Sequence, residues 1–372
     1  MVKKMKFEEL EQFYKGRRVF ITGHTGFKGS WLSLLLLMLG ADVYGYALKA
    51  PTEPDLFSIL RLPERMHHTI GDVRDFEALK KAYNAAEPDV VFHLAAQPIV
   101  RDSYKWPRET YETNVMGTVN LLETMRLYPT AESFLNVTTD KVYENNDLPM
   151  HAFREDEKLD GFDPYSNSKS CSELVTHSYR KAFFGNGASA GDTAAGMAGE
   201  LPLQISTARA GNVIGGGDFA NDRIIPDCVR DTITGKPVHV RNPYSTRPYQ
   251  HVLEPLSVYL MIAMQQVREP GCAGCYNVGP DESDAITTGE IAGLFVKYWG
   301  GTATWISQAE KNAPHEASYL RLDCSRLKET FGWKPVWHVE EAVRAAVLWY
   351  KAWHEGQEMT SVTEQQIRDF FA

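Results

Sequence analysis

The feature that most constrains the fold is a glycine-rich turn near the start of the chain, in the segment VFITGHTGFKGSWLSLLLLMLGADVYGY. A short apolar run at Val19–Thr22 is followed by glycines at positions 23, 26 and 29, a helix from about Lys28, and a second strand at Asp42–Tyr46. Glycines at this spacing let the backbone turn tightly and approach a pyrophosphate, whose charge the free N–H groups of the helix can meet. The segment therefore predicts a dinucleotide-binding βαβ unit, with a plain structural turn as the alternative.

Strand-like and helix-like runs alternate beyond this unit. The predicted strands are His68–Ile70, Val90–Leu94, Ser133–Thr138 and Ile205–Ala208, and the predicted helices are Phe76–Ala86, about Pro107–Leu127 and about Ser166–Phe184. Strands separated by helices imply an α/β fold with a Rossmann-type, doubly wound parallel sheet. Because 372 residues are many for one core, we expect two parts. These are a cofactor domain at 1–211 with a return segment at about 251–280, and a smaller mixed α/β substrate-binding lobe at 212–250 and 281–372.

Composition argues against several classes of partner. A net charge of −9 gives no support to nucleic-acid or anionic-membrane binding. The longest apolar run, Leu32–Leu39, is too short to cross a bilayer, and Met1–Arg18 lacks the apolar core of a signal peptide. We therefore expect a cytoplasmic enzyme. The single CxxC motif, Cys272–Cys275, has no second CxxC or paired histidines near it, so no metal site is expected.

Two polar segments contain the candidate catalytic residues. In DPYSNSKSCSE, Tyr165 and Lys169 are four residues apart and fall on one face of a helix. A tyrosine with an ordinary pKa near 10 can act as a base when a neighbouring ammonium stabilises its phenolate, and such a base suits the oxidation of an alcohol. The upstream tripeptide Thr139-Asp140-Lys141 in VTTDKVYEN adds a hydroxyl, an acid and a second base. This combination suggests oxidation followed by elimination.

The motifs resemble, in order and over essentially the full chain, those of the extended branch of the short-chain dehydrogenase/reductase superfamily. They are Gly23-His24-Thr25-Gly26-Phe27-Lys28-Gly29, Gly71-Asp72-Val73, His93-Leu94-Ala95-Ala96-Gln97, Asn114-Val-Met-Gly117-Thr118 and Tyr165-Ser-Asn-Ser-Lys169. The resemblance implies that NAD is bound by residues of these motifs. They are Gly23, His24, Thr25, Gly26, Phe27, Lys28, Gly29, Asp72, Val73, Leu94, Ala95, Ala96, Asn114, Tyr165 and Lys169.

The residues at the end of the second predicted strand bear on the choice between NAD and NADP. NAD-dependent folds often have Asp or Glu at the end of the second strand, where it binds the adenosine ribose. Here the corresponding segment, Tyr44–Lys49, has no carboxylate, and Lys49 would instead attract a 2′-phosphate. The family resemblance implies NAD, so we expect NAD with weak retention.

Within this branch, nucleotide-sugar 4-epimerases usually have small hydroxyl-bearing residues where this chain has Asp140-Lys141, whereas 4,6-dehydratases have an acid followed by a base. This chain resembles the dehydratases, with Lys in place of their usual Glu. The stretches RAGNVIGGGDF, RPYQHVLEPL and HEASYLRLDCSRL add to the similarity and imply CDP-glucose as the small-molecule substrate. The alternatives are a nucleotide-sugar 4-epimerase or a dehydratase of dTDP- or GDP-linked sugar. A non-catalytic cofactor sensor on this fold would be expected to lack Tyr165 or Lys169.

The resemblance also implies a role for each candidate. Tyr165, assisted by Lys169, takes the proton of the sugar O4, and Thr139 orients that oxygen. Lys141 removes the C5 proton, and Asp140 protonates the departing O6. A lysine base needs its pKa lowered by burial or by a nearby cation such as Lys169. The alternative is that Lys141 only stabilises an enolate by its charge.

Substrate contacts and assembly are expected mainly by analogy. The substrate-binding candidates are Gln97, Arg101, Asn212, Arg247, His315 and Tyr319. Arginine suits phosphate oxygens, which favours Arg247 for the pyrophosphate. A structural or cofactor-proximal role is expected for His93, at a strand end. The two long predicted helices match those that related enzymes pair across a two-fold axis, so we expect a homodimer or a tetramer of dimers.

Overall fold

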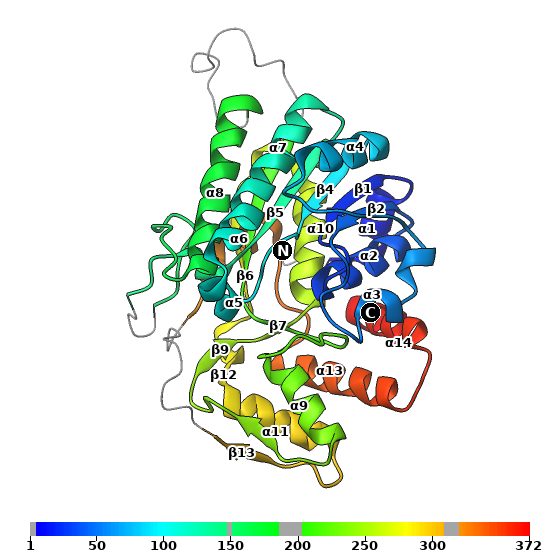
Figure 1. Ribbon diagram of the computed structural model, residues 1–372, viewed down its shortest axis with the longest axis vertical. Coiled ribbons are helices and arrows are strands. Elements are labelled where there is room, and N and C mark those ends of the chain that lie inside the picture. Colours follow the sequence, from blue (N-terminus) through cyan, green and yellow to red (C-terminus); the bar gives the residue numbers. More distant parts are fainter. Residues whose placement is uncertain (1–4, 147–150, 186–202, 309–319) are drawn as a thin grey trace.

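The computed structural model describes residues 5–146, 151–185, 203–308 and 320–372. Its centre is a seven-stranded sheet with the order β11-β6-β5-β4-β1-β2-β3, in which every neighbouring pair is parallel (Figure 1). The strands are β1 (Arg18–Thr22), β2 (Asp42–Ala47), β3 (His67–Ile70), β4 (Val90–His93), β5 (Ser133–Thr139), β6 (Gln204–Ala210) and β11 (Cys275–Val278). The predicted Rossmann-type doubly wound sheet is confirmed.

Helices cover both faces of this sheet (Figure 1). The helices that lie on the sheet, together with those that pack against them, are α1 (Phe7–Tyr14), α2 (Phe27–Met38), α3 (Leu56–Ile59), α4 (Phe76–Ala86), α5 (Val100–Lys105), α6 (Pro107–Tyr111), α7 (Gly117–Leu127), α8 (Pro164–Phe183) and α10 (Leu253–Arg268). Alternate strand residues point to opposite faces. Val19 and Ile21 of β1 therefore join the core beneath α2 and α10, whereas Phe20 between them joins the core beneath α4 and α7.

The long helix predicted at about Pro107–Leu127 is interrupted. A π-helical turn at Glu112–Met116 separates α6 from α7. The buried residue Asn114 lies in this turn and bonds to Ser168 of α8 and to the backbone of Gln97. Single π-helical turns are rare and occur frequently at functional sites, and the apolar pattern of the sequence did not indicate this one.

The remaining elements gather mainly at one end of the seven-stranded sheet (Figure 1). They are α9 (Ile224–Ile233), α11 (Thr288–Trp299), α12 (Ser325–Phe331), α13 (Val339–His354), α14 (Met359–Phe371), and the two-stranded sheets formed by β7 (Val213–Ile214) with β10 (Gln250–His251), β8 (Val238–Val240) with β13 (Trp305–Ser307), and β9 (Thr246–Pro248) with β12 (Ala285–Thr287). Helix α14 packs against both α13 and α2, and α12 packs against β11 of the central sheet. Among the described residues, no helix combines the length and the apolar character needed to span a membrane.

Candidate active site

The predicted catalytic residues meet at the carboxyl edge of the sheet. Thr139 is the last residue of β5, and Asp140 begins a short 3-10 turn, η3 (Asp140–Val142). Tyr165 is the second residue of α8, and Lys169 follows one turn later on the same face. Because α8 packs against both β5 and η3, the two polar segments come together here.

Asp140 is buried, with 2% of its surface exposed. Its Oδ1 accepts a hydrogen bond from the Thr139 hydroxyl at 3.0 Å, whereas its Oδ2 is buried without a hydrogen-bond partner among the described residues. Burial raises the pKa of this carboxyl group, against the opposing charges of Lys141, Arg247 and Lys28. A carboxyl group of this kind is suited to donate a proton.

The pKa values of Tyr165 and Lys169 are shifted in opposite directions, away from each other. Burial raises the pKa of Tyr165 to about 12, and a hydrogen bond with Thr139 opposes this shift. Lys169 is 3% exposed, and its Nζ donates a hydrogen bond to the Val137 carbonyl at 3.2 Å. Burial and the charge of Lys28 lower the pKa of Lys169 to about 8. Lys169 therefore remains mostly cationic at neutral pH, when its charge can stabilise a phenolate.

Lys141 is partly buried beside the carboxyl group of Asp140. Its backbone N–H donates a hydrogen bond to the Thr139 hydroxyl at 3.4 Å. The cation whose charge acts on Lys169 is Lys28 from α2. Lys28 thus lies within the catalytic cluster as well as in the glycine-rich turn.

The glycine-rich turn fits a dinucleotide pyrophosphate. A Cβ at Gly23, whose φ is +81°, would lie 2.7 Å from the backbone N of Ala95, and a Cβ at Gly29 would lie 2.1 Å from the Gly23 carbonyl oxygen. The fold itself thus requires these two glycines. A Cβ at Gly26 would meet only the Gly23 oxygen, at 3.5 Å, so the fold leaves space there for a ligand. Gly26 precedes Phe27, where α2 begins, and the first N–H groups of that helix are directed at this space.

His24 of this motif is buried within the protein, and Asp72 of the acidic turn is ion-paired. The His24 ring is buried against Gly45, where a Cβ would lie 2.4 Å from the ring, and neither ring nitrogen has a hydrogen-bond partner among the described residues. Burial and the nearby His68 lower the pKa of His24 to about 3, so this ring is neutral. Asp72 is paired with Arg74, with 2.6 Å between Oδ2 and Nη2.

Several other residues predicted to bind the cofactor also have contacts within the protein. Thr25 donates a hydrogen bond to the carbonyl of Leu48, and Val73 is buried against Gly117. Leu94, Ala95 and Ala96 follow β4 directly, and the backbone of Leu94 and Ala95 lies beside Gly23.

The loop that follows is tied to the helices by its amides. The side-chain amide of Gln97 bonds to Ile99 and Thr110, and its backbone N–H donates to Asn114 at 2.8 Å. His93 is a buried histidine whose two nitrogens bond to Thr22 and Thr118, which agrees with the structural role expected for it.

The predicted substrate-binding residues are placed less uniformly. Arg247 on β9 is 8% exposed, and its charge acts on Asp140 in the catalytic cluster. Arg101 on α5 lies 3.9 Å from the carboxylate of Asp222. Asn212 precedes β7, and its carbonyl accepts a hydrogen bond from the backbone of Gln250. His315 and Tyr319 lie outside the described residues.

One residue of the cluster was missed by sequence reasoning. Arg223 immediately precedes α9, pairs with Asp218 at 2.7 Å, and exerts its charge on Tyr165 and Lys28. A signal was present, because Arg223 lies between the glycine-rich loop at 215–217 and an amphipathic helical segment. Nothing in that pattern, however, indicated which side chain the arginine would face.

Sequence comparison finds related proteins along almost the whole chain. A family model described as GDP-mannose 4,6 dehydratase matches residues 20–189. The chain is 48% identical over 363 residues to a CDP-glucose 4,6-dehydratase from Salmonella typhimurium, an alignment that covers 97% of this chain and 98% of that protein. It is 24% identical over 361 residues to a dTDP-glucose 4,6-dehydratase from Haemophilus influenzae, covering 89% of this chain and 97% of the relative.

Solved structures share the fold. A dTDP-glucose 4,6-dehydratase from Bacillus anthracis, in complex with NAD, has a TM-score of 0.71 and 21% identity, covering 91% of this chain and 98% of that one. A UDP-glucose 4-epimerase from Thermotoga maritima, with UDP-glucose, has a TM-score of 0.74 and 20% identity, covering 90% and 99%. At these identities the likeness shows the fold, and the chemistry must be argued from the site.

Proposed function

We propose that this chain, which belongs to the family of nucleotide-sugar 4,6-dehydratases, removes water from CDP-D-glucose to give CDP-4-keto-6-deoxy-D-glucose. The main observation is that Thr139, Asp140 and Lys141 at the end of β5 lie against Tyr165 and Lys169 at the start of α8. Tyr165 and Lys169 can remove the proton of a hydroxyl that is being oxidised. Asp140 and Lys141 can donate one proton to the same sugar and remove another from it. The choice of CDP-glucose is supported by the full-length similarity to the Salmonella typhimurium enzyme.

The order of steps follows from the chemistry of glucose. Its C5–H is not acidic and its C6 hydroxyl is a poor leaving group, so direct loss of water would be slow. A ketone at C4 removes the first obstacle, because the carbanion at C5 then becomes an enolate. NAD, held at the glycine-rich turn of residues 23–29, would supply the hydride acceptor for C4 and the hydride donor for C6.

Tyr165 begins the reaction by taking the proton of the C4 hydroxyl. The cationic Lys169, one turn along α8, stabilises the phenolate that accepts this proton. Thr139 orients the same oxygen through its hydroxyl. Loss of this proton from O4 together with the hydride from C4 would leave a ketone at C4.

Lys141 and Asp140 then perform the elimination. Lys141 takes the proton from C5, and the electron pair forms the C5–C6 double bond as the C6–O6 bond breaks. Asp140, whose pKa is raised by burial, gives its proton to O6, which leaves as water. Hydride return to C6 and reprotonation at C5 complete the product.

The remaining expectations belong to the same proposal. NAD is held at the turn formed by residues 23–29, and Arg247 faces the substrate pyrophosphate. The enzyme works in the cytoplasm as a homodimer or as a tetramer of two dimers. Exposed apolar side chains on α7, α8 and the π-helical turn support pairing through these helices; they are Met116, Leu127 and Leu174.

The test is to incubate the purified protein with CDP-glucose, with and without added NAD, and to analyse the product by mass spectrometry. We expect loss of one water and a keto group at C4, with faster conversion when NAD is added. An unchanged mass with inversion at C4 would indicate an epimerase instead. If dTDP- or UDP-glucose alone were converted, the dehydratase assignment would stand and the choice of nucleotide would be wrong.

A further inference from the structure

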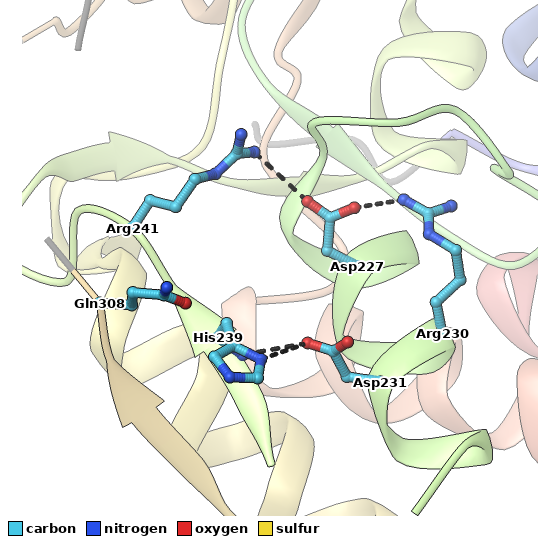
Figure 2. A pocket seen from close by; sticks show the side chains of 6 residues that line it. All are labelled: Asp227, Arg230, Asp231, His239, Arg241 and Gln308. Atoms are coloured by element: carbon cyan, nitrogen blue, oxygen red, sulfur yellow. Dashed lines mark hydrogen bonds and ion pairs between the residues drawn. The ribbon is translucent and has the colours of Figure 1, made fainter. Parts of the chain in front are cut away.

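A polar pocket opens in the smaller part of the molecule, between α9 and the paired strands β8 and β13 (Figure 2). Its volume is about 280 Å³. It is lined by Asp227, Arg230, Asp231, His239, Arg241 and Gln308. We propose that this pocket receives the base of the nucleotide sugar, and that Asp231 selects cytosine by accepting a hydrogen bond from the exocyclic amine. This inference rests on the proposed function, because it assigns the base-specificity of the same substrate.

Helix α9 leads from the catalytic residues to the pocket. Arg223, which immediately precedes α9, exerts its charge on Tyr165. Asp227 and Asp231 follow on one face of the helix, and with a rise of about 1.5 Å per residue Asp231 lies roughly 12 Å along the axis from Arg223. A nucleotide sugar has a diphosphate and a ribose between its hexose and its base. A hexose at Tyr165 and a diphosphate near Arg223 would therefore bring the base to the face of α9 that lines the pocket.

Ion pairs hold Arg241 at the end of the pocket nearer to the catalytic centre. Its Nη1 pairs with Asp222, the neighbour of Arg223, and its Nη2 lies 3.4 Å from the carboxylate of Asp227. Figure 2 shows the guanidinium of Arg241 directed toward Asp227 across the pocket. The pocket thus has the Arg241 guanidinium as a hydrogen-bond donor at the end nearer to the catalytic centre. The carboxylates of Asp227 and Asp231 lie along the wall formed by α9.

This order of donor and acceptor matches cytosine. The O2 of the base is adjacent to the ring nitrogen that carries the ribose, so it enters on the side of the catalytic centre, where Arg241 can donate to it. The amine at C4 lies on the far side of the ring and reaches toward Asp231, which lies one helical turn beyond Asp227. Aspartate commonly accepts from the cytosine amine in nucleic-acid recognition. Uracil and thymine present a carbonyl oxygen at that position, which a carboxylate repels.

The carboxylate of Asp231 is held in place and still has acceptor capacity. Its Oδ2 receives hydrogen bonds from the backbone N–H of His239 at 3.1 Å and from Nδ1 of that ring at 3.2 Å (Figure 2). Both bonds go to one oxygen, whereas an ionised carboxylate offers about four acceptor positions. His239 therefore fixes the carboxylate without exhausting it.

The experiment compares kcat/KM for CDP-glucose and UDP-glucose in the full-length enzyme with saturating NAD. Asp231→Asn keeps the shape of the side chain and adds a donor, so we expect the preference for CDP-glucose to fall about 10-fold or more. Gln308→Ala removes a polar group from the opposite wall and should affect both substrates alike. Asp369→Asn, an exposed substitution on α14, is the matched control and should leave the ratio unchanged.

Calorimetric binding of CDP and UDP separates this inference from the proposed function. Suppose that the protein converts no nucleotide sugar, that it binds CDP more tightly than UDP, and that Asp231→Asn removes this preference. The base-specificity of the pocket would then be supported although the proposed function had failed. Equal binding of CDP and UDP by the unmodified protein would overturn it. An unchanged preference in a variant that circular dichroism shows to be folded would do the same. Asp231→Ser is a second variant with the same expected loss, for use if the asparagine variant does not fold.

Discussion

The buried pair of Glu173 and Arg209 links the catalytic helix to the sheet, and its disruption should measurably destabilise the protein. Glu173 on α8 and Arg209 on β6 have side chains that are 2% and 3% exposed, with 3.0 Å between Oε2 and Nη2. Glu173 also accepts hydrogen bonds from Thr207 at 2.7 Å and from Thr138 at 2.5 Å. The substitution Glu173→Gln keeps the size of the side chain and removes its charge, so the guanidinium stays buried without this partner.

The magnitude follows from the burial of the pair. Removal of one member of a buried ion pair costs about 3–5 kcal/mol. We expect the lower end of this range, because Arg209 also donates to the carbonyl of Glu155 at 3.0 Å and to the hydroxyl of Tyr143 at 2.9 Å. For 372 residues the unfolding entropy is roughly 0.8 kcal/mol per degree, so a loss of about 3 kcal/mol lowers Tm by about 4 °C.

Differential scanning calorimetry and urea unfolding measure this loss. The matched control is the double substitution Glu173→Leu with Arg209→Met, which leaves no unpaired charge. It should lose less stability than the sum of its two single substitutions, by about 0.5–3 kcal/mol. A Tm within about 1 °C of the unmodified protein for Glu173→Gln, or additive losses in the double variant, would refute the reasoning that an unpaired charge dominates.

Three further predictions test the site and the pH dependence of stability. Lys141→Met should slow water loss by about 10²–10⁴-fold. Oxidation at C4 should continue, and it can be followed as the appearance of reduced cofactor in a single turnover. A variant that dehydrates the substrate at the full rate would reject Lys141 as the base. Gly29→Ala should destabilise the fold by about 1–3 kcal/mol, because its Cβ would lie 2.1 Å from the Gly23 oxygen. Gly26→Ala should instead spare Tm and weaken NAD binding in a titration, and equal Tm losses would contradict this distinction. Burial lowers the pKa of His93 from 6.5 to about 3, so the unfolded chain binds a proton that the folded protein does not. The free energy of unfolding should therefore fall as pH decreases below 6.5, by up to about 1.4 kcal/mol per pH unit for this histidine. A urea midpoint that stays constant down to about pH 5 would disprove this prediction.

Much of the fold could be predicted because its signals are local. The helix Phe76–Ala86 was predicted with the bounds that the structure has, and the first strand differs by one residue at its start. Apolar periodicity reports which face of an element is buried, and glycine spacing reports where the backbone must turn. For the same reason, Tyr165 and Lys169 could be placed on one face of a helix before the structure was known.

The sequence by itself determined the alternation of strands and helices, the glycine-rich turn and the acid–base residue types at the ends of predicted elements. Only the tertiary structure decided which of these residues meet. Lys28 joins the catalytic cluster, Arg223 faces Tyr165, and the side chains of Gln97 and Asn114 bond within the protein. The physical reason is that pKa shifts and hydrogen bonds depend on distances between residues far apart in the chain, and these distances are set by how α2, α8 and α9 pack around the edge of the sheet.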